Sequence, residues 1–388
     1  MTFFLIASAI KVFVVLNLIL VGVALLTLLE RRVCAWMQDR LGPNRVGPQG
    51  LFQPAADGLK NILKEETSPA MADKTLFTLA PIVSFVPAML TFGVIPFASP
   101  LPTPWGVVPM VVADLPVGFL YILAISSLGV YGIVLAGWAS NNKYALLGGL
   151  RASAQMISYE IALGMSTVAV ILLAGNVTLS QVIAQQQLAH AWFIIPLTVA
   201  FVIFFISALA ETNRLPFDLP EAEGELIAGY HTEYSAMKFS MFYIAEYSNM
   251  VTASALMATL FFGGWDIPFT TWDSTGDPRV LKTLLTLAAF GAKTFAFLFT
   301  YIWVRWTLPR FRYDQLMALG WKVLLPLSLV YITLVAVAIW FVRIRLGWEY
   351  GAGMAWVLGG LNFVLLIALV YWLDRGRLVS GSVQEEAA

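Results

Sequence analysis

Acidic side chains are concentrated in one short stretch of this sequence, directly after an apolar run that is long enough to cross a membrane. The stretch from Ala210 to Glu225 contains one arginine, Arg214, and the carboxylates of Glu211, Asp218, Glu221, Glu223 and Glu225. A charged side chain at the centre of a bilayer costs roughly 3 kcal/mol on insertion scales, so such residues are functional candidates. A concentration of acids at the mouth of an apolar helix is typical of a path for protons or cations.

The acids at 221, 223 and 225 occur at every second residue. On a helix only the first and last of them would share a face, whereas in an extended chain all three would. In either case several carboxylates are crowded, which favours proton exchange among them near neutral pH. A solvated acidic loop is the alternative. The apolar pairs Pro216-Phe217 and Leu226-Ile227 argue against it, because a solvated loop would not need such anchors.

Further ionisable residues fall inside or at the edges of apolar segments: Lys11, Asp114, Glu160, Glu246, Lys293 and Arg305. Glu160 is expected about two turns into its helix, and Glu246 shares a helix face with Tyr243 and Asn249. Lys293 is the cation predicted to balance these acids. The alternative is that Glu–Lys pairs only join helices together. Lys11 and Asp114 lie near predicted helix ends, where a charged side chain can reach the interface or cap the helix.

The composition indicates an integral membrane protein. Of 388 residues, 59% are hydrophobic and 12% are charged, and the formal net charge is zero, which argues against a nucleic-acid partner. One cysteine and two histidines argue against a metal site or an iron–sulfur cluster in this chain. Nucleotide-binding glycine motifs and catalytic triads are absent from the sequence, so the chain is not expected to be a self-contained enzyme.

Nine apolar segments of about 20 residues, the length of a membrane-spanning helix, can be marked. They predict an all-α polytopic fold with about nine transmembrane helices near residues 3–29, 76–97, 117–139, 153–174, 192–212, 239–263, 283–307, 323–342 and 354–373. The first segment ends in Glu30-Arg31-Arg32 rather than in a cleavage site, and it is therefore interpreted as a retained helix.

The distribution of basic residues predicts the orientation. With the N-terminus outside, 16 of the 23 Lys and Arg residues lie in the cytoplasm. The cytoplasmic segments are then 30–75, 140–152, 213–238, 308–322 and the C-terminal tail. The opposite orientation would invert this excess, so the positive-inside rule favours the first.

The long segment 30–75 combines a turn-rich sequence, Gly42 to Pro48, with an amphipathic pattern. Leu51, Ala55, Leu59 and Ile62 recur at helical spacing, and charged residues take the other side. This helix could lie on the lipid surface or dock soluble partner proteins. We favour docking, because its charges are mixed in sign rather than mainly basic.

Together these segments resemble a membrane subunit family of respiratory complex I, the H-type subunit of the bacterial enzyme and subunit 1 of the mitochondrial enzyme. The motifs that carry the resemblance are Leu29 to Arg32, Gln38 to Pro48, Gly137 to Asn141, Gln155 to Glu160, Ala210 to Glu225, Ala245 to Tyr247 and Pro309 to Met317. They cover most of the chain, and residues beyond about 350 add a ninth helix to the usual eight.

The resemblance implies a complex I core at 1–342, an additional C-terminal transmembrane helix at 343–373 and a flexible cytoplasmic tail at 374–388. Five core helices would form an antiporter-like unit. The implied residues of a quinone chamber are Glu30, Arg31, Arg40, Asp57, Arg214, Asp218 and Arg310. The implied proton relay comprises Glu160, Glu211, Glu221, Glu223, Glu225 and Glu246. Quinone (ubiquinone or menaquinone) would be the substrate, with flavin and iron–sulfur clusters on partner subunits of NADH:quinone oxidoreductase in a bacterial inner membrane.

Two alternatives remain open from the sequence. Membrane-bound hydrogenases and formate-hydrogen lyases contain a subunit of similar architecture that passes no electrons to quinone. The turn-rich Gly42–Pro48 motif and the acidic 210–225 stretch favour the quinone version. A stand-alone cation or proton transporter would be expected to show broken helices in an inverted repeat, and it would not need the charged segment 30–75.

Overall fold

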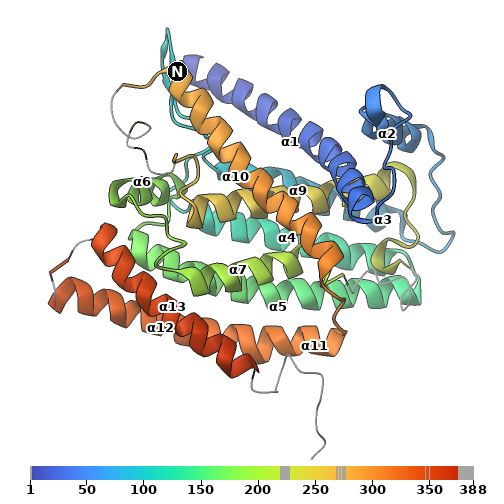
Figure 1. The fold of residues 1–388 in the computed structure, drawn as a ribbon. Helices are drawn as coiled ribbons and strands as arrows, with labels where there is room; N and C mark the ends of the chain where they lie inside the picture. Colours follow the sequence, from blue (N-terminus) through green and yellow to red (C-terminus); the bar gives the residue numbers. More distant parts are fainter. Residues whose placement is uncertain are drawn as a thin grey trace, which may run out of the picture.

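A computed structural model of the chain describes residues 2–218, 228–267, 270, 272, 277–345, 347–348 and 350–374. Long helices dominate the fold, and short 3-10 or π helices are labelled η (Figure 1). In chain order the elements are α1 (Thr2–Met37), η1 (Pro48–Gly50), α2 (Gln53–Leu63), α3 (Lys74–Thr91), η2 (Phe92–Val94), β1 (Leu101–Thr103), β2 (Gly106–Val108), α4 (Gly118–Ala139), α5 (Lys143–Ala174), α6 (Leu179–Ala189), α7 (Thr198–Glu211), η3 (Gly229–His231), α9 (Ala236–Phe261), α10 (Val280–Thr307), α11 (Tyr313–Ala318), η4 (Leu319–Leu324), α12 (Leu325–Trp340), η5 (Phe341–Arg345) and α13 (Ala352–Asp374).

Every predicted apolar segment contains a helix, which confirms the all-α polytopic fold class. Within the described ranges, seven helical stretches are long and apolar enough to cross a bilayer. The remaining two predicted segments correspond to α7, which has only 14 residues, and to α9, which has 26 residues and includes Lys238, Glu246 and a series of Ser, Thr and Asn residues. The one sheet within the described residues is the β1–β2 hairpin, in which Leu101 lies opposite Val108.

Helix α1 extends beyond its predicted end. It runs to Met37, so Glu30, Arg31 and Arg32 are helical residues and not part of a loop that begins at residue 30. Its 36 residues span about 54 Å at 1.5 Å per residue, whereas the hydrocarbon core of a bilayer is about 30 Å thick. A helix of this length must tilt or project beyond the hydrocarbon core, and α1 and α10 run obliquely to α5 and α12 (Figure 1).

The loops predicted at 140–152 and 308–322 are largely helical. Helix α5 begins at Lys143 because the Asn142 side chain accepts a hydrogen bond from the backbone N–H of Tyr144 at 2.9 Å, which caps the first turn. Glu160 therefore lies near the middle of α5 rather than two turns from its start. The second loop becomes helical at Tyr313, where the Gln315 side chain accepts a hydrogen bond from the backbone N–H of Arg312 at 3.1 Å.

The predicted span at 192–212 is interrupted. Its helical part, α7, starts only at Thr198, after a non-helical turn that contains Pro196. Proline cannot donate a backbone hydrogen bond and commonly starts or breaks a helix. Non-helical backbone at membrane depth is tolerated where protein buries it, and α13 supplies that cover.

Asn362 of α13 is the residue that joins this helix to the interrupted span. Its side-chain amide donates to the Pro196 carbonyl and to the Leu358 carbonyl at 3.0 Å, and its Oδ1 accepts from the Tyr331 hydroxyl at 2.6 Å. Asn362 is 1% exposed. One turn earlier, Gly359 leaves room for the backbone of Ile195 to approach closely.

Replacing Asn362 with leucine is expected to loosen α13. The change leaves the Pro196 carbonyl and the Tyr331 hydroxyl without these contacts, at a cost of about 1 kcal/mol or more in the free energy of unfolding. The midpoint of thermal unfolding in mild detergent should fall relative to wild type. Phe363→Leu, at an exposed neighbouring position, is the control and should change it little. Equal midpoints for both variants would contradict the role of Asn362.

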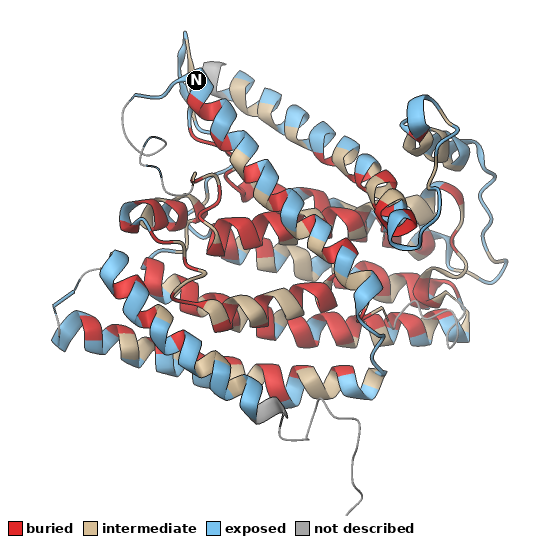
Figure 2. Ribbon diagram, viewed as in Figure 1, coloured by how far each residue is buried: buried red, intermediate tan, exposed pale blue. Residues whose placement is uncertain are grey.

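Buried residues concentrate on α5, α7 and α9, whereas α1, α10 and α13 carry long exposed stretches (Figure 2). Small residues allow the inner helices to pack closely. A β-carbon on Gly132 of α4 would collide with Ser84 of α3, and one on Gly148 of α5 would lie 2.6 Å from Cα of Gly229. The polar residues described below lie within this tightly packed part of the fold.

Candidate functional site

Glu30, Arg214 and Glu246 meet in the interior although they come from three distant parts of the chain. Arg214 Nε lies 2.7 Å from Oε1 of Glu246, and Arg214 Nη1 lies 3.3 Å from Oε1 of Glu30. Their side chains are only 7–14% exposed. A planar guanidinium presents several fixed donors and can contact two carboxylates at once. Arg214 therefore bridges α1 and α9.

Arg305 and Tyr247 complete this group. Arg305 of α10 forms an ion pair with Glu30, and the Tyr247 hydroxyl donates to Glu30 Oε2 at 2.7 Å. The Arg214 guanidinium also lies over the Tyr247 ring, 4.2 Å from its centroid. We call Glu30, Arg214, Glu246 and Arg305 the ionic cluster. Its two acids and two bases balance in charge.

Balanced charge makes the cluster sensitive to the loss of one member. Charges taken out of water are costly, and removing one partner of a buried pair typically destabilises a protein by about 3–5 kcal/mol. Replacement of the whole set by apolar residues would often be neutral in stability. A buried ionic cluster is therefore weak support for a purely structural role, and it suits groups whose protonation or pairing changes during function.

A small cavity lies next to the ionic cluster. It has a volume of about 30 Å³, and its polar lining includes Ser84, Glu211, Thr212, Asn213, Glu246 and Asn249. One water needs about 10–15 Å³ of such space and two or more polar partners. The cavity therefore has room for water between the carboxyl groups of Glu211 and Glu246. We call it the acid cavity.

Two consecutive serines of α4 contact the next acids. Ser127 Oγ donates a hydrogen bond to Glu160 Oε1, and Ser126 lies close enough to the Glu211 side chain to interact with it. Glu160 also lies close enough to Glu211 for their charges to interact. The carboxyl groups of α5 and α7 thus approach each other beside a pair of hydroxyl groups, which can donate and accept protons.

Gln155 of α5 fixes the loop that carries Arg214. It is fully buried, and its Nε2 lies 2.8 Å from the Ala210 carbonyl, 2.8 Å from the Phe217 carbonyl and 3.1 Å from Asn213 Oδ1. These contacts hold both ends of the 210–217 segment. Arg214 is consequently positioned by a rigid support.

The remaining predicted chamber residues divide into two pairs and one separate side chain. Arg31 Nη1 contacts Asp57 Oδ2 at 2.6 Å and joins α1 to α2, while Arg310 Nη2 lies 3.4 Å from Asp218 Oδ2. Arg40 is exposed on the turn after α1, with its Nε 2.7 Å from Gln38 Oε1. Successive helix residues point about 100° apart, so Glu30 faces the ionic cluster while Arg31 faces α2.

Asp57 remains a carboxylate over a wide pH range. Partial burial opposes ionisation, but the Arg31 hydrogen bond and charge outweigh it and hold the pKa of Asp57 below its ordinary value. The Gln53 side chain donates a further hydrogen bond at 3.1 Å. The α1–α2 junction therefore presents a fixed negative charge beside a basic residue.

The prediction that Lys293 balances the buried acids is wrong. Lys293 Nζ donates to the carbonyls of Phe262 at 2.7 Å and Asp266 at 2.6 Å, just beyond the C-terminal end of α9. Glu246 lies 16 residues before Phe262 in the sequence, about 24 Å away along a helix. Arg214 and Arg305 supply the positive charge at Glu30 and Glu246. Carbonyl oxygens at a helix C-terminus attract a cation, which accounts for the position of Lys293.

Three of the predicted relay acids, Glu221, Glu223 and Glu225, lie outside the described residues. The structure also adds residues to which sequence reasoning gave no role: Tyr247, Arg305, Ser126, Ser127 and Gln155. Arg305 in an apolar helix and Tyr247 beside Glu246 were visible signals. The two serines carried no such signal, because hydroxyl groups are common in membrane helices, where they bond to their own backbone.

Comparison with known proteins gives the family. Residues 10–336 match the family described as NADH dehydrogenase. The chain is 51% identical to the NADH-quinone oxidoreductase H-type subunit 1 of Geobacter metallireducens over 335 residues, which cover 86% of this chain and 96% of the relative. It is also 51% identical to the H-type subunit 2 of the same enzyme in Geobacter sulfurreducens over 332 residues, with 86% and 96% covered. The H-type subunit 2 of Koribacter versatilis is 51% identical over 346 residues, with 86% and 97% covered. This chain, with its buried ionic cluster and interior acids, therefore belongs to the NADH dehydrogenase family of membrane subunits.

Proposed function

We propose that this chain is the membrane subunit of a bacterial NADH:quinone oxidoreductase that forms much of the quinone chamber and couples quinone reduction to proton translocation. The observation that carries the proposal is that Arg214 bridges Glu30 and Glu246. The sequence resemblance assigned Glu30 and Arg214 to the chamber and Glu246 to the relay. Because one guanidinium contacts both acids, it connects the proposed quinone chamber directly to the proposed proton relay.

The electrons would come from partner subunits. Reduction of a quinone to a quinol takes two electrons and two protons, and one cysteine with two histidines offers no basis for an electron-carrying cluster in this chain. The contribution of this chain is to hold the substrate and to move protons. Its apolar helices suit a quinone tail, and a few polar groups suit the headgroup.

The coupling step would start at Arg214. A change in charge near Glu30 alters how strongly that acid attracts the guanidinium, and the contact between Arg214 and Glu246 changes in response. Weaker pairing favours protonation of the Glu246 carboxylate, and stronger pairing favours release of the proton. The protein thereby converts a charge change in the chamber into proton uptake or release at α9.

From Glu246 the proton would cross water in the acid cavity to Glu211. It would then pass by Ser126 and Ser127 to Glu160 near the middle of α5. Glu221, Glu223 and Glu225 would connect the relay to the cytoplasmic side. The relatives described above are named as subunits of NADH-quinone oxidoreductase. Similarity to them supports the proposed function over the hydrogenase and stand-alone transporter alternatives.

Substitution at the α1–α2 junction tests the chamber. Asp57→Asn keeps the size of the side chain but removes the charge that pairs with Arg31, an interaction of about 1 kcal/mol for a partly exposed pair. We expect the apparent KM for quinone to rise roughly fivefold, while NADH:ferricyanide activity, which needs no quinone, is preserved. Lys64→Gln, at the exposed end of α2, is the matched control. Loss of both activities in Asp57→Asn would indicate failed assembly, and an unchanged KM would remove Asp57 from the chamber.

The proposed orientation places the N-terminus outside the bacterial inner membrane and the 38–73 segment in the cytoplasm, where partner subunits would dock. The excess of basic residues on that side supports it. In a Cys34→Ser background, Lys64→Cys should react with a membrane-impermeant thiol reagent in inverted vesicles but not in intact cells. Reaction in intact cells would reverse the orientation.

A further inference from the structure

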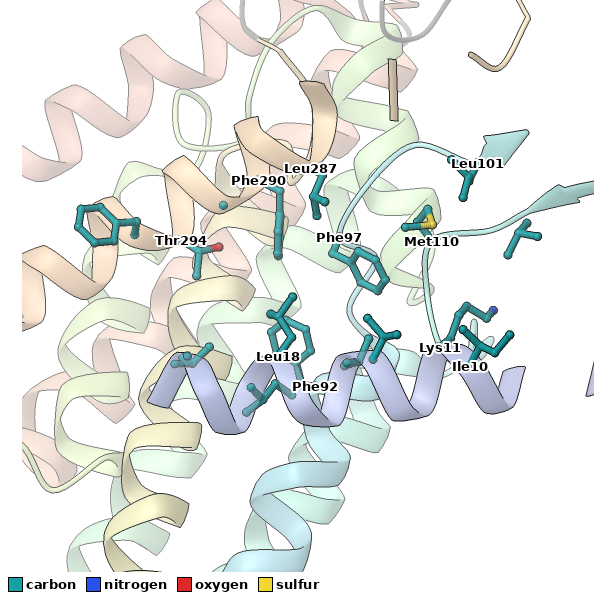
Figure 3. A pocket seen from close by; sticks show the side chains of 18 of the residues that line it. Ile10, Lys11, Leu18, Phe92, Phe97, Leu101, Met110, Leu287, Phe290 and Thr294 are labelled. Atoms are coloured by element: carbon teal, nitrogen blue, oxygen red, sulfur yellow. The ribbon is translucent and has the colours of Figure 1, made fainter. Parts of the chain in front are cut away.

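A large apolar groove lies between α1 and α10, closed at one end by the β1–β2 hairpin (Figure 3). Its volume is about 1230 Å³, and apolar side chains from Ile6 to Leu29 on α1 and from Leu287 to Leu298 on α10 form its long walls. Leu18 and Phe295 line the groove and are 63% and 50% exposed, so it opens sideways. We call this feature the apolar groove.

The apolar groove lies at the depth of the bilayer. Both long walls belong to helices that are apolar enough to cross a membrane. Gly22 of α1 and Gly291 of α10 line it, and nothing lies within 4 Å of the position that a β-carbon would take on either residue. The groove is thus an open space that faces hydrocarbon, and a flexible apolar chain fits its chemistry.

One cationic side chain, Lys11, lies among the residues that line the groove. Its Nζ donates to the Val111 carbonyl at 2.7 Å and contacts the Pro109 carbonyl at 3.4 Å. Among the residues that the structure describes, no carboxylate lies within ion-pair distance of Lys11. An ammonium has three N–H donors, so one is left for a ligand. A cation that no described carboxylate neutralises attracts an anionic group to this end of the groove.

The Lys11 end of the groove has the features of a membrane–water interface. Trp105 lies there in the turn between β1 and β2 and is 78% exposed, and tryptophan is enriched at the level of lipid headgroups. The apolar spanning stretch of α1 begins at Leu5. Lys11 is six residues further on, about 9 Å along the helix, so its long side chain can bring the ammonium to the level of the lipid headgroups.

We propose that the apolar groove is a binding site for a phospholipid, whose acyl chain lies between α1 and α10 and whose phosphate pairs with Lys11. This site is distinct from the proposed quinone chamber. Lys11 lies 19 residues before Glu30, about 28 Å away along α1, and a quinone headgroup carries no anionic phosphate for the ammonium to neutralise.

The test uses the intact complex and a defined lipid. The purified complex is reconstituted in phosphatidylcholine vesicles that contain phosphatidylglycerol with a diazirine on one acyl chain. Exchange into detergent then removes loosely bound lipid, and the sample is irradiated and digested. In wild type we expect the retained label on peptides of α1 and α10 that line the groove, and little on α13. Equal labelling of α13, or no label on α1, would overturn the proposal.

Three variants sharpen the test. Lys11→Gln, which removes the charge but can still donate hydrogen bonds, should reduce the label on α1 roughly tenfold, whereas Lys11→Arg should retain it. Gly22→Phe should reduce it by filling the groove, and Gly360→Phe, at an open helical glycine of α13, is the matched control. Full retention of the label on α1 in Lys11→Gln would contradict the phosphate contact. This result decides between the two outcomes even if the Gly22→Phe complex fails to assemble.

Two other occupants give different results. If the groove holds a quinone tail, excess long-chain quinone will displace the label, and the proposal is wrong. If a helix of a partner protein fills it, the wild-type complex will yield no label on α1. NADH:quinone activity should be unchanged in Lys11→Gln, so failure of the lipid site and failure of the proposed function are distinguishable.

Discussion

Replacement of Arg214 with lysine is expected to leave an assembled complex that has lost most of its quinone-coupled activity and proton pumping. Lysine keeps the positive charge but is a compact point charge, which cannot contact Glu30 and Glu246 with fixed donors at the same time. Losing one charge-assisted contact costs about 1.5–3 kcal/mol. This corresponds to roughly a 10- to 100-fold reduction in quinone-coupled activity. NADH:ferricyanide activity measures assembly of the redox arm, and quenching of a pH-sensitive dye in vesicles measures pumping.

The matched control is Arg345→Lys, at an exposed position of η5. It should leave both activities unchanged. Arg214→Leu is expected to impair assembly, because two buried acids would then share only Arg305. Adding Glu246→Gln to Arg214→Leu removes one charge of each sign and should restore assembly without restoring pumping. Normal pumping in an assembled Arg214→Lys complex would disprove the bridging role.

Replacement of Glu211 with glutamine is expected to suppress quinone-coupled activity and pumping by roughly 100-fold, the contribution of a positioned proton-transfer group. Glutamine keeps the size and most hydrogen bonding of the side chain but cannot titrate. Glu211 lines the acid cavity together with Glu246 and also contacts Ser126, so it lies between two parts of the proposed relay. The complex should assemble, as judged by NADH:ferricyanide activity.

Glu211→Asp should be milder, because it keeps an ionisable group. Asp114→Asn provides a comparable loss of a carboxylate away from the relay, where Asp114 accepts a hydrogen bond from Ser180 at 2.8 Å. That variant should pump normally. If an assembled Glu211→Gln complex pumps as well as wild type, Glu211 is not in the relay and the contact is structural.

Local sequence was sufficient to predict the helices. Apolar runs of about 20 residues identify membrane spans, since every backbone polar group in a bilayer must be paired internally. The positions of the helix ends depended on finer features. The Asn142 cap started α5 ten residues earlier than predicted, and the turn at Pro196 delayed the start of α7. The hydrogen bond from the Asn362 side chain to the Pro196 carbonyl could not be predicted, because it joins residues 166 positions apart.

The amino-acid sequence alone identifies the acids that would be expensive in a membrane, because burial cost depends on residue type and on the surrounding apolar run. It did not determine their partners. Glu30 and Arg214 are 184 residues apart, and their contact depends on how α1, α7 and α9 pack and rotate. A shift of one residue turns a helical side chain by about 100°, so Glu30 joins the ionic cluster while Arg31 pairs with Asp57. The same dependence placed Lys293 at the end of α9 and left Arg305 to neutralise Glu30, because only the packed helices fix which charges meet.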